Sequence, residues 1–97
     1  MRNVMVRYQV KPGRVAEHET LLRAVFDELA KTAPKGIRYG AFKQSDGVSF
    51  VHVGFIEAEP NPLDAIGAFK AFTAQIRERC DDPPSAVDLV GVGAYGF

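Results

Sequence analysis

The alternation of apolar and polar residues near the start of the chain predicts a β-strand. Over Val4–Val10 every second residue is apolar, and the positions between them hold Met5, Arg7 and Gln9. Because successive side chains of a strand point to opposite faces, this segment has one apolar face and one face of mixed polarity. The Lys11–Gly13 segment then ends the strand.

Between Val15 and Lys31 the spacing of apolar residues changes to three and four, which predicts an amphipathic helix. The apolar stripe of this helix consists of Val15, Leu22, Val25, Phe26 and Leu29. Pro34 and Gly36 end the helix. His18 lies on or beside the stripe, and we interpret it as a half-buried histidine packed at the edge of the core.

The segment from Ile37 to Ile56 predicts a β-hairpin around which the other elements are organised. Asp46-Gly47 lies between the two arms and suits a type I′ turn, in which both central residues have positive φ. The second arm is apolar on both faces, one carrying Phe50, His52, Gly54 and Ile56 and the other Val51, Val53 and Phe55. Such a strand is covered on both faces. We expect the bulky Val51 face to pack on the helices and His52 to lie on the opposite side of the sheet.

A second helix and a last strand follow the hairpin. Asn61 is suited to cap a helix and Pro62 to its first position. Apolar residues then recur at helical spacing, namely Leu63, Ile66, Phe69, Phe72 and Ile76. Asp81–Pro84 ends this helix, and Val87–Tyr95 predicts the last strand. The order β-α-β-β-α-β in residues 1–97 indicates one α+β domain with a ferredoxin-like fold, in which a four-stranded antiparallel sheet carries two helices on one face.

Two helices cover only one face of such a sheet, so the other face needs a different cover. We expect apolar residues such as Met5, Phe42, Phe50 and Ile56 on that face, which is more apolar surface than monomers commonly expose. A second copy packed sheet against sheet is the simplest cover, and the expected assembly is a homodimer.

Composition argues against several classes of protein. Lys and Arg together number 12, as do Asp and Glu, so the chain lacks the basic surface expected of a nucleic-acid-binding protein. No apolar run reaches the roughly 18 residues of a membrane span, and Met1–Asn3 leads into the first strand without a signal-peptide pattern. The single cysteine, Cys80, fits a reducing cytoplasm and leaves no His/Cys cluster for a metal. We therefore expect a cytoplasmic protein that binds neither nucleic acid nor membranes and uses no metal.

The segment Gly91–Gly96 matches the GxGxxG pattern of dinucleotide-binding proteins letter for letter. In those proteins the glycines open a helix whose N-terminus holds the pyrophosphate. Only Phe97 follows here, so we expect a bulge or a close approach of the backbone, and no nucleotide cofactor.

His52 is the most informative candidate for chemistry. It lies in the middle of a strand and shares a face with Gly54, which leaves space beside it. A buried histidine can act as a general base near neutral pH. On our assignment of faces, His52 lies near Arg7 and Gln9 of the first strand. The alternative is a histidine that is hydrogen-bonded at the dimer interface.

Arg7, Arg38 and Tyr39 are candidates for binding an anionic or phenolic ligand, because a buried guanidinium requires a partner. An intersubunit salt bridge explains an interior arginine equally well. Whether Arg38 or Tyr39 faces the cavity depends on the register of the hairpin, since a slip of one residue exchanges them.

Taken together, several segments resemble the dimeric α/β-barrel superfamily, and specifically small proteins of the antibiotic-biosynthesis-monooxygenase type. The segments that carry the resemblance are Lys11–Gly13, Gly36–Tyr39, Phe50–Val53, Phe69–Phe72 and the final strand ending at Tyr95. The resemblance implies that two ferredoxin-like sheets close a barrel around a cavity. Some members of that family oxidise polyphenolic substrates without metal or flavin, so the resemblance implies this chemistry as an expectation for the present chain. The present chain has no Trp, and it carries Ile56 and Gly54 where such proteins commonly have a tryptophan and an acidic residue.

Two hypotheses for function follow. In the first, the protein is a cofactor-independent monooxygenase acting on a small phenolic or quinol-like molecule: His52 deprotonates the substrate, Arg7 holds the anion, Tyr39 orients it, and the substrate carbanion reacts with dioxygen. In the second, the protein is a non-catalytic small-molecule-binding or stress-associated barrel. The missing tryptophan favours the second hypothesis, and the resemblance favours the first.

Overall fold

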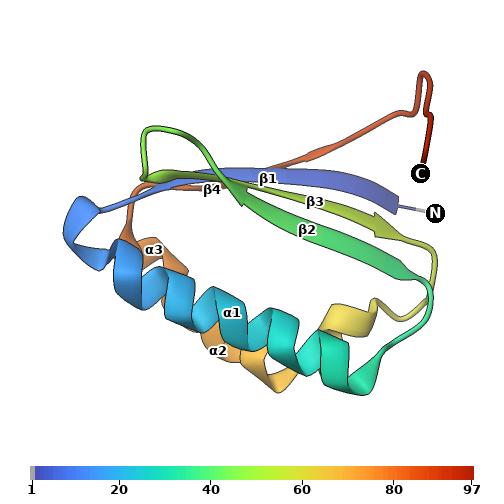
Figure 1. Cartoon of the computed structure of the whole chain (residues 1–97), viewed down its shortest axis with the longest axis horizontal. Helices are drawn as coiled ribbons and strands as arrows, with labels where there is room; N and C mark the ends of the chain where they lie inside the picture. The colour runs from blue at the N-terminus through green and yellow to red at the C-terminus, as the bar shows by residue number, and fades with distance from the viewer. Residues whose placement is uncertain (1) are drawn as a thin grey trace.

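The computed structural model describes residues 2–97 and confirms the expected order of elements and the ferredoxin-like α+β fold. The elements are β1 (Arg2–Val10), the 3₁₀ turn η1 (Pro12–Arg14), α1 (Val15–Thr32), β2 (Ile37–Lys43), β3 (Ser49–Ile56), the 3₁₀ turn η2 (Pro62–Ala65), α2 (Gly67–Ala74), α3 (Ile76–Arg79) and β4 (Cys80–Asp88). The strands form one antiparallel sheet in the order β2-β3-β1-β4, and the helices cover one face of it (Figure 1). None of the helices in residues 2–97 is both long enough and apolar enough to cross a membrane.

The two central strands decide which side chains meet the helices. Val6 of β1 lies opposite His52 of β3, and Tyr8 lies opposite Phe50. Residues directly opposite one another in an antiparallel pair share a face. Their face packs on α1 and α2 to form the core, which consists of Tyr8, Val10, Leu22, Val25, Phe50, Phe72 and Cys80.

The prediction of which face of β3 meets the helices was wrong. Phe50, His52, Gly54 and Ile56 are all buried, and they face the helices. The residues between them, Val51, Val53 and Phe55, are half-buried and lie on the face of the sheet away from the helices, which we call the open face. Phe50 and Ile56 therefore do not contribute to the open face. The sequence could not decide this point because both faces of β3 are apolar, and because His52 finds polar partners inside the core.

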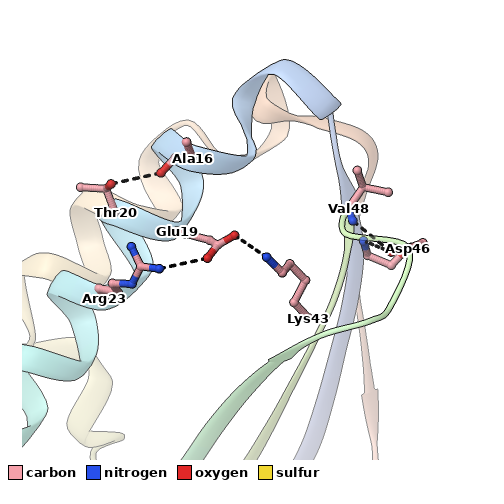
Figure 2. Close-up of polar contacts among 8 residues, drawn as sticks. Ala16, Glu19, Thr20, Arg23, Lys43, Asp46 and Val48 are labelled. Carbon is pink, nitrogen blue, oxygen red and sulfur yellow. Dashed lines mark hydrogen bonds and ion pairs between the residues drawn. The ribbon is translucent and has the colours of Figure 1, made fainter.

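The hairpin is confirmed, but its turn differs from the expected one. Gly47 has a φ of +79°, whereas Asp46 does not have a positive φ, so a type I′ turn is not formed. Instead, the carboxylate of Asp46 accepts hydrogen bonds from the backbone N–H groups of Val48 and Ser49, at 3.0 and 2.8 Å (Figure 2). A carboxylate that accepts local backbone donors is a common way to order a wider loop.

An ion-pair bridge ties the hairpin to the first helix. The carboxylate of Glu19 on α1 lies 2.8 Å from the Lys43 ammonium at the end of β2 and 3.2 Å from the Arg23 guanidinium one turn further along α1 (Figure 2). The cationic groups are largely exposed, so the bridge orients the two elements more than it stabilises the fold.

The second helix is interrupted, unlike the continuous helix that its apolar spacing predicts. Asn61 caps η2 as expected, its side chain accepting a hydrogen bond from the N–H of Leu63 at 3.0 Å. Ile66 then adopts an extended conformation, with φ −91° and ψ 107°, and separates η2 from α2. Gln75, with φ −131° and ψ 27°, separates α2 from α3.

The prediction of the last strand was also wrong in its bounds. β4 spans Cys80–Asp88 and includes the prolines that were expected to precede it. Proline is tolerated because β4 is an edge strand and because the ladder is irregular there: Arg7 pairs with Ser85, but Gln9 pairs with Asp82. After β4 the chain leaves the sheet as an irregular tail (Figure 1), and the ring of Phe97 lies 5.5 Å from that of Phe55 on the open face.

Candidate functional site

His52 lies at the centre of the sheet with both ring nitrogens occupied. Its side chain is 3% exposed. Its Nε2 lies 2.7 Å from the hydroxyl oxygen of Tyr8, and its Nδ1 lies 2.5 Å from the hydroxyl oxygen of Tyr39. Tyr39 lies opposite Gly54 on the neighbouring strand, so the register of the hairpin places the tyrosine, and not Arg38, on the face of His52.

The hydrogen bonds continue from Tyr8 into the helices. The Tyr8 hydroxyl lies 2.6 Å from Nε2 of His18, a fully buried residue of α1. Nε of Arg79, the last residue of α3, donates to Nδ1 of His18 at 3.1 Å. Nη2 of Arg79 donates to the backbone carbonyl of Phe72 at 2.5 Å. We call the series Tyr39, His52, Tyr8, His18 and Arg79 the buried network.

Local sequence explains how each member reaches the network. Tyr8 and His52 lie on the helix-facing sides of adjacent strands. His18 precedes Leu22 by one helical turn and lies on the same buried stripe of α1, so it points at the sheet. Arg79 lies where α3 gives way directly to β4, and this sharp connection directs its side chain inward, where it is 2% exposed.

Aromatic rings enclose the buried network. The Phe50 ring stacks on Tyr8 with centroids 5.5 Å apart and planes at 7°. The Phe72 ring lies 5.0 Å from His18 and 5.9 Å from His52. These rings keep water away, so each hydrogen bond of the network is stronger and each loss of a partner more costly than at the surface.

Burial sets the protonation states within the network. Removal from water lowers the pKa of His52 to about 4, and the nearby His18 adds to this effect. Burial and then the positive charge of Arg79 lower the pKa of His18 to about 4. Burial raises the pKa of the Tyr8 and Tyr39 hydroxyls above the ordinary value. At neutral pH both histidines are therefore uncharged and both tyrosines are protonated.

Tyr39 is the member of the network that reaches the edge of the core. It is half-buried, and the Phe26 ring stacks on it at 5.5 Å. Beside it lies a shallow cavity of about 300 Å³ that is lined by Phe26, Leu29, Ala30, Ala33, Pro34, Ile37 and Tyr39. Tyr39 is the only polar side chain in that lining. A second cavity of about 330 Å³ lies on the same edge between α1 and β2 and is lined by Phe26, Ala41, Phe42 and Lys43 among others.

The other predicted site residues do not join His52. Arg7 lies opposite Val51 and Arg38 opposite Phe55, so both share the open face. Gln9 lies on that face as well, beside Arg7 in a polar cavity of about 310 Å³. The expectation that His52 lies near Arg7 and Gln9 was wrong because it rested on the reversed assignment of faces in β3. A site containing both His52 and Arg7 is not formed within residues 2–97 of the chain.

Sequence reasoning missed Tyr8, His18 and Arg79 as parts of a polar site. Tyr8 was treated as one of the apolar residues of its strand, and His18 was expected to be half-buried at the edge of the core. The usable signal for His18 was its place on the same stripe as Leu22 and Val25. Arg79 gave no signal, because an arginine near the end of a helix is commonly exposed.

No arrangement of side chains that would suit a metal ion occurs within residues 2–97, where no three His, Cys, Asp or Glu side chains form a group. The GxGxxG segment lies in the irregular tail after β4, and no helix follows it in residues 91–97.

Comparison with known proteins gives no match to a family model and no match among curated proteins. Solved structures do resemble the fold. The structure of Rv0793 from Mycobacterium tuberculosis has a TM-score of 0.74 at 21% identity, over 96% of each chain. SnoaB, a cofactor-independent oxygenase from Streptomyces nogalater, has a TM-score of 0.70 at 15% identity, over 99% of this chain and 97% of that one. A structure named antibiotic biosynthesis monooxygenase has a TM-score of 0.67 at 21% identity, over 96% of this chain and 100% of that one. The likeness confirms the ferredoxin-like fold of the single chain, and at these identities it concerns the fold alone.

Proposed function

We propose that the protein is a cofactor-independent monooxygenase that acts on a small phenolic or quinol-like molecule bound beside Tyr39. The observation that carries the proposal is the buried network, whose one half-buried member, Tyr39, lies against an otherwise apolar cavity. A planar aromatic ligand suits such a cavity, because apolar walls bury the ring while one hydroxyl fixes its orientation.

The proposed oxygenation requires few catalytic groups from the protein, because the substrate itself reacts with dioxygen. A phenol with an activated CH₂ group loses a proton and forms a carbanion whose charge is delocalised onto its oxygen. The carbanion reacts with dioxygen, one oxygen atom becomes the new carbonyl oxygen of the product, and the other leaves as water with the two hydrogens of the CH₂ group. All the electrons come from the substrate, so no external reductant is required.

Tyr39 would stabilise the anionic intermediate by donating a hydrogen bond to its oxygen. His52 holds the Tyr39 hydroxyl at 2.5 Å and therefore acts on a ligand through it. The direct role of His52 as base stays a prediction, and it would require the Tyr39 side chain to move aside. Arg7, on the open face, has no contact with this site in one protomer.

The alternative is a binding protein without catalysis. The occupied ring nitrogens of His52 and its low pKa of about 4 favour this alternative, because they make the histidine a weak base at neutral pH. Binding by the same cavity would need only the apolar walls and the Tyr39 hydroxyl.

Oxygen uptake with a panel of quinols and anthrone-like phenols distinguishes the monooxygenase from the binding protein. We expect uptake without any additive, and we expect it to fall at least tenfold in Tyr39→Phe and His52→Ala. Tyr95→Phe serves as the matched control, since it makes the same chemical change at a side chain that is 97% exposed. Uptake at the rate of buffer alone, together with binding of the same compounds, would assign the protein to the binding class.

We also propose that the protein is a homodimer that covers the open face. This face carries Met5, Val51, Val53 and Phe55, which are half-buried, together with Val87, which is 46% exposed. Sheet-against-sheet packing would remove these apolar groups from water and would place Arg7 in an interface.

A further inference from the structure

Arg79 carries a buried positive charge that forms no close ion pair within residues 2–97, although the Glu17 carboxylate acts on it from farther away. It is 2% exposed, and the ion pairs formed within residues 2–97 do not include it. Its partners are Nδ1 of His18, the carbonyl of Phe72 and the face of the Phe72 ring, whose centroid lies 5.4 Å from Cζ. A buried charge without a close counter-ion is costly, so packing alone does not account for an arginine at this position.

The chemistry of the guanidinium determines the direction of every hydrogen bond in the buried network. Arginine can only donate, so Nδ1 of His18 accepts and carries no hydrogen. A neutral histidine has one ring N–H, which in His18 must then lie on Nε2. This N–H donates to the Tyr8 oxygen, and Tyr8 has only its own hydrogen left to donate, to Nε2 of His52. His52 therefore carries its hydrogen on Nδ1 and donates it to the Tyr39 oxygen.

Tyr39 is thus left with a hydroxyl hydrogen that no group of the buried network accepts. If every hydrogen bond of the network ran the other way, from Tyr39 toward His18, the hydrogen of His18 would lie on Nδ1. It would then face the Nε–H of Arg79, and two hydrogens would meet in one contact. Only one arrangement places a single hydrogen in each link of the network, and in that arrangement the free group at its open end is the Tyr39 hydroxyl donor.

We propose that Arg79 fixes this direction, so that Tyr39 permanently presents a hydrogen-bond donor and the site prefers ligands with an acceptor oxygen: a phenolate, an enolate or a quinone carbonyl. Arg79 and His18 are positioning residues in this scheme, since neither touches the ligand. The negative charge of a bound oxyanion would complement the positive charge at the other end of the network. The ligand preference rests on the proposed site at Tyr39, whereas the direction of the network does not.

The direction of hydrogen-bond donation along the buried network is measured by ¹⁵N NMR of the histidine rings, in the full-length protein at neutral pH. We expect His18 to be protonated on Nε2 and His52 on Nδ1. In Arg79→Met, which keeps a long apolar stem, His52 should become a mixture of both ring forms. In Arg79→Gln, whose amide can still donate to His18, the original forms should persist. A His52 ring protonated on Nε2 in the unaltered protein would overturn the proposal, and this measurement does not depend on any variant folding.

The ligand preference is measured with 4-nitrophenol, whose phenol and phenolate forms absorb differently. We expect the bound probe to ionise at least about one pH unit lower than in water, which corresponds to tenfold tighter binding of the phenolate. The shift should vanish in Tyr39→Phe and shrink in Arg79→Met, while Tyr95→Phe, at a side chain that is 97% exposed, should leave it unchanged. A bound probe that ionises as in water would refute the acceptor preference. If the shift is present but no substrate consumes oxygen, the proposed enzyme fails and this inference stands.

Discussion

Replacing Tyr8 by phenylalanine tests whether the buried network is a stabilising feature of the fold. The substitution removes one oxygen atom and leaves the ring that stacks on Phe50. It deletes two hydrogen bonds at once, of 2.6 Å to His18 and 2.7 Å to His52. It leaves the Nε2–H of His18 without an acceptor and Nε2 of His52 without a donor.

The expected loss follows from the burial of the two orphaned groups. His18 is 0% exposed and His52 is 3% exposed, and the space left by one hydroxyl is too small to hold a water that serves both. An unsatisfied buried polar group costs about 1–3 kcal/mol. With two such groups, we expect Tyr8→Phe to lower the free energy of unfolding by about 2–6 kcal/mol, a large part of the roughly 5–15 kcal/mol typical of a whole domain.

Urea denaturation followed by circular dichroism measures this loss, and the m-value should stay unchanged because the surface buried on folding is the same. Tyr95→Phe is the matched control. Its side chain is 97% exposed, so its loss should lie within about 0.5 kcal/mol of zero. A Tyr8→Phe protein as stable as this control would refute the reasoning, since it would mean that Tyr8, His18 and His52 are not held in the hydrogen-bonded geometry described above.

Three further predictions concern pH, space and assembly. The ordinary pKa of 6.5 falls to about 4 in folded His18 and His52, so the unfolded chain binds more protons and stability is lost as pH falls. Between pH 7 and 5, where carboxylates titrate little, the two histidines together should lower the free energy of unfolding by roughly 4 kcal/mol. A flat stability profile over this range would contradict the burial of neutral histidines. A Cβ at Gly54 would lie 3.4 Å from Cδ1 of Tyr39. Gly54→Ala should therefore retain binding of 4-nitrophenol, and Gly54→Val should displace the tyrosine and abolish binding. Light scattering over a dilution series should show a dimer, and the substitution Val53→Asp on the open face should dissociate it. A compact monomer at micromolar concentration would rule out the dimer.

The elements that could be predicted are those whose pattern is local. Alternation identified β1, three- and four-residue spacing identified α1, and two apolar arms around Asp46-Gly47 identified the hairpin. Prediction failed at β4, because prolines that interrupt a central strand are compatible with an edge strand, and strand order is not a local property.

The candidate site depended on tertiary structure to a greater degree. The sequence by itself determined that His52 is central to a buried strand and that Tyr39 or Arg38, never both, would share its face. It could not determine which face of β3 meets the helices, because both are apolar and the choice depends on packing against distant residues. Only the folded chain brings together Tyr8, His18 and Arg79, which come from three elements, with Arg79 61 residues away from His18. The physical reason is that a hydrogen bond has a direction and a length of about 3 Å, so whether a polar side chain is a surface group or part of a buried network is decided by partners that composition and periodicity do not specify.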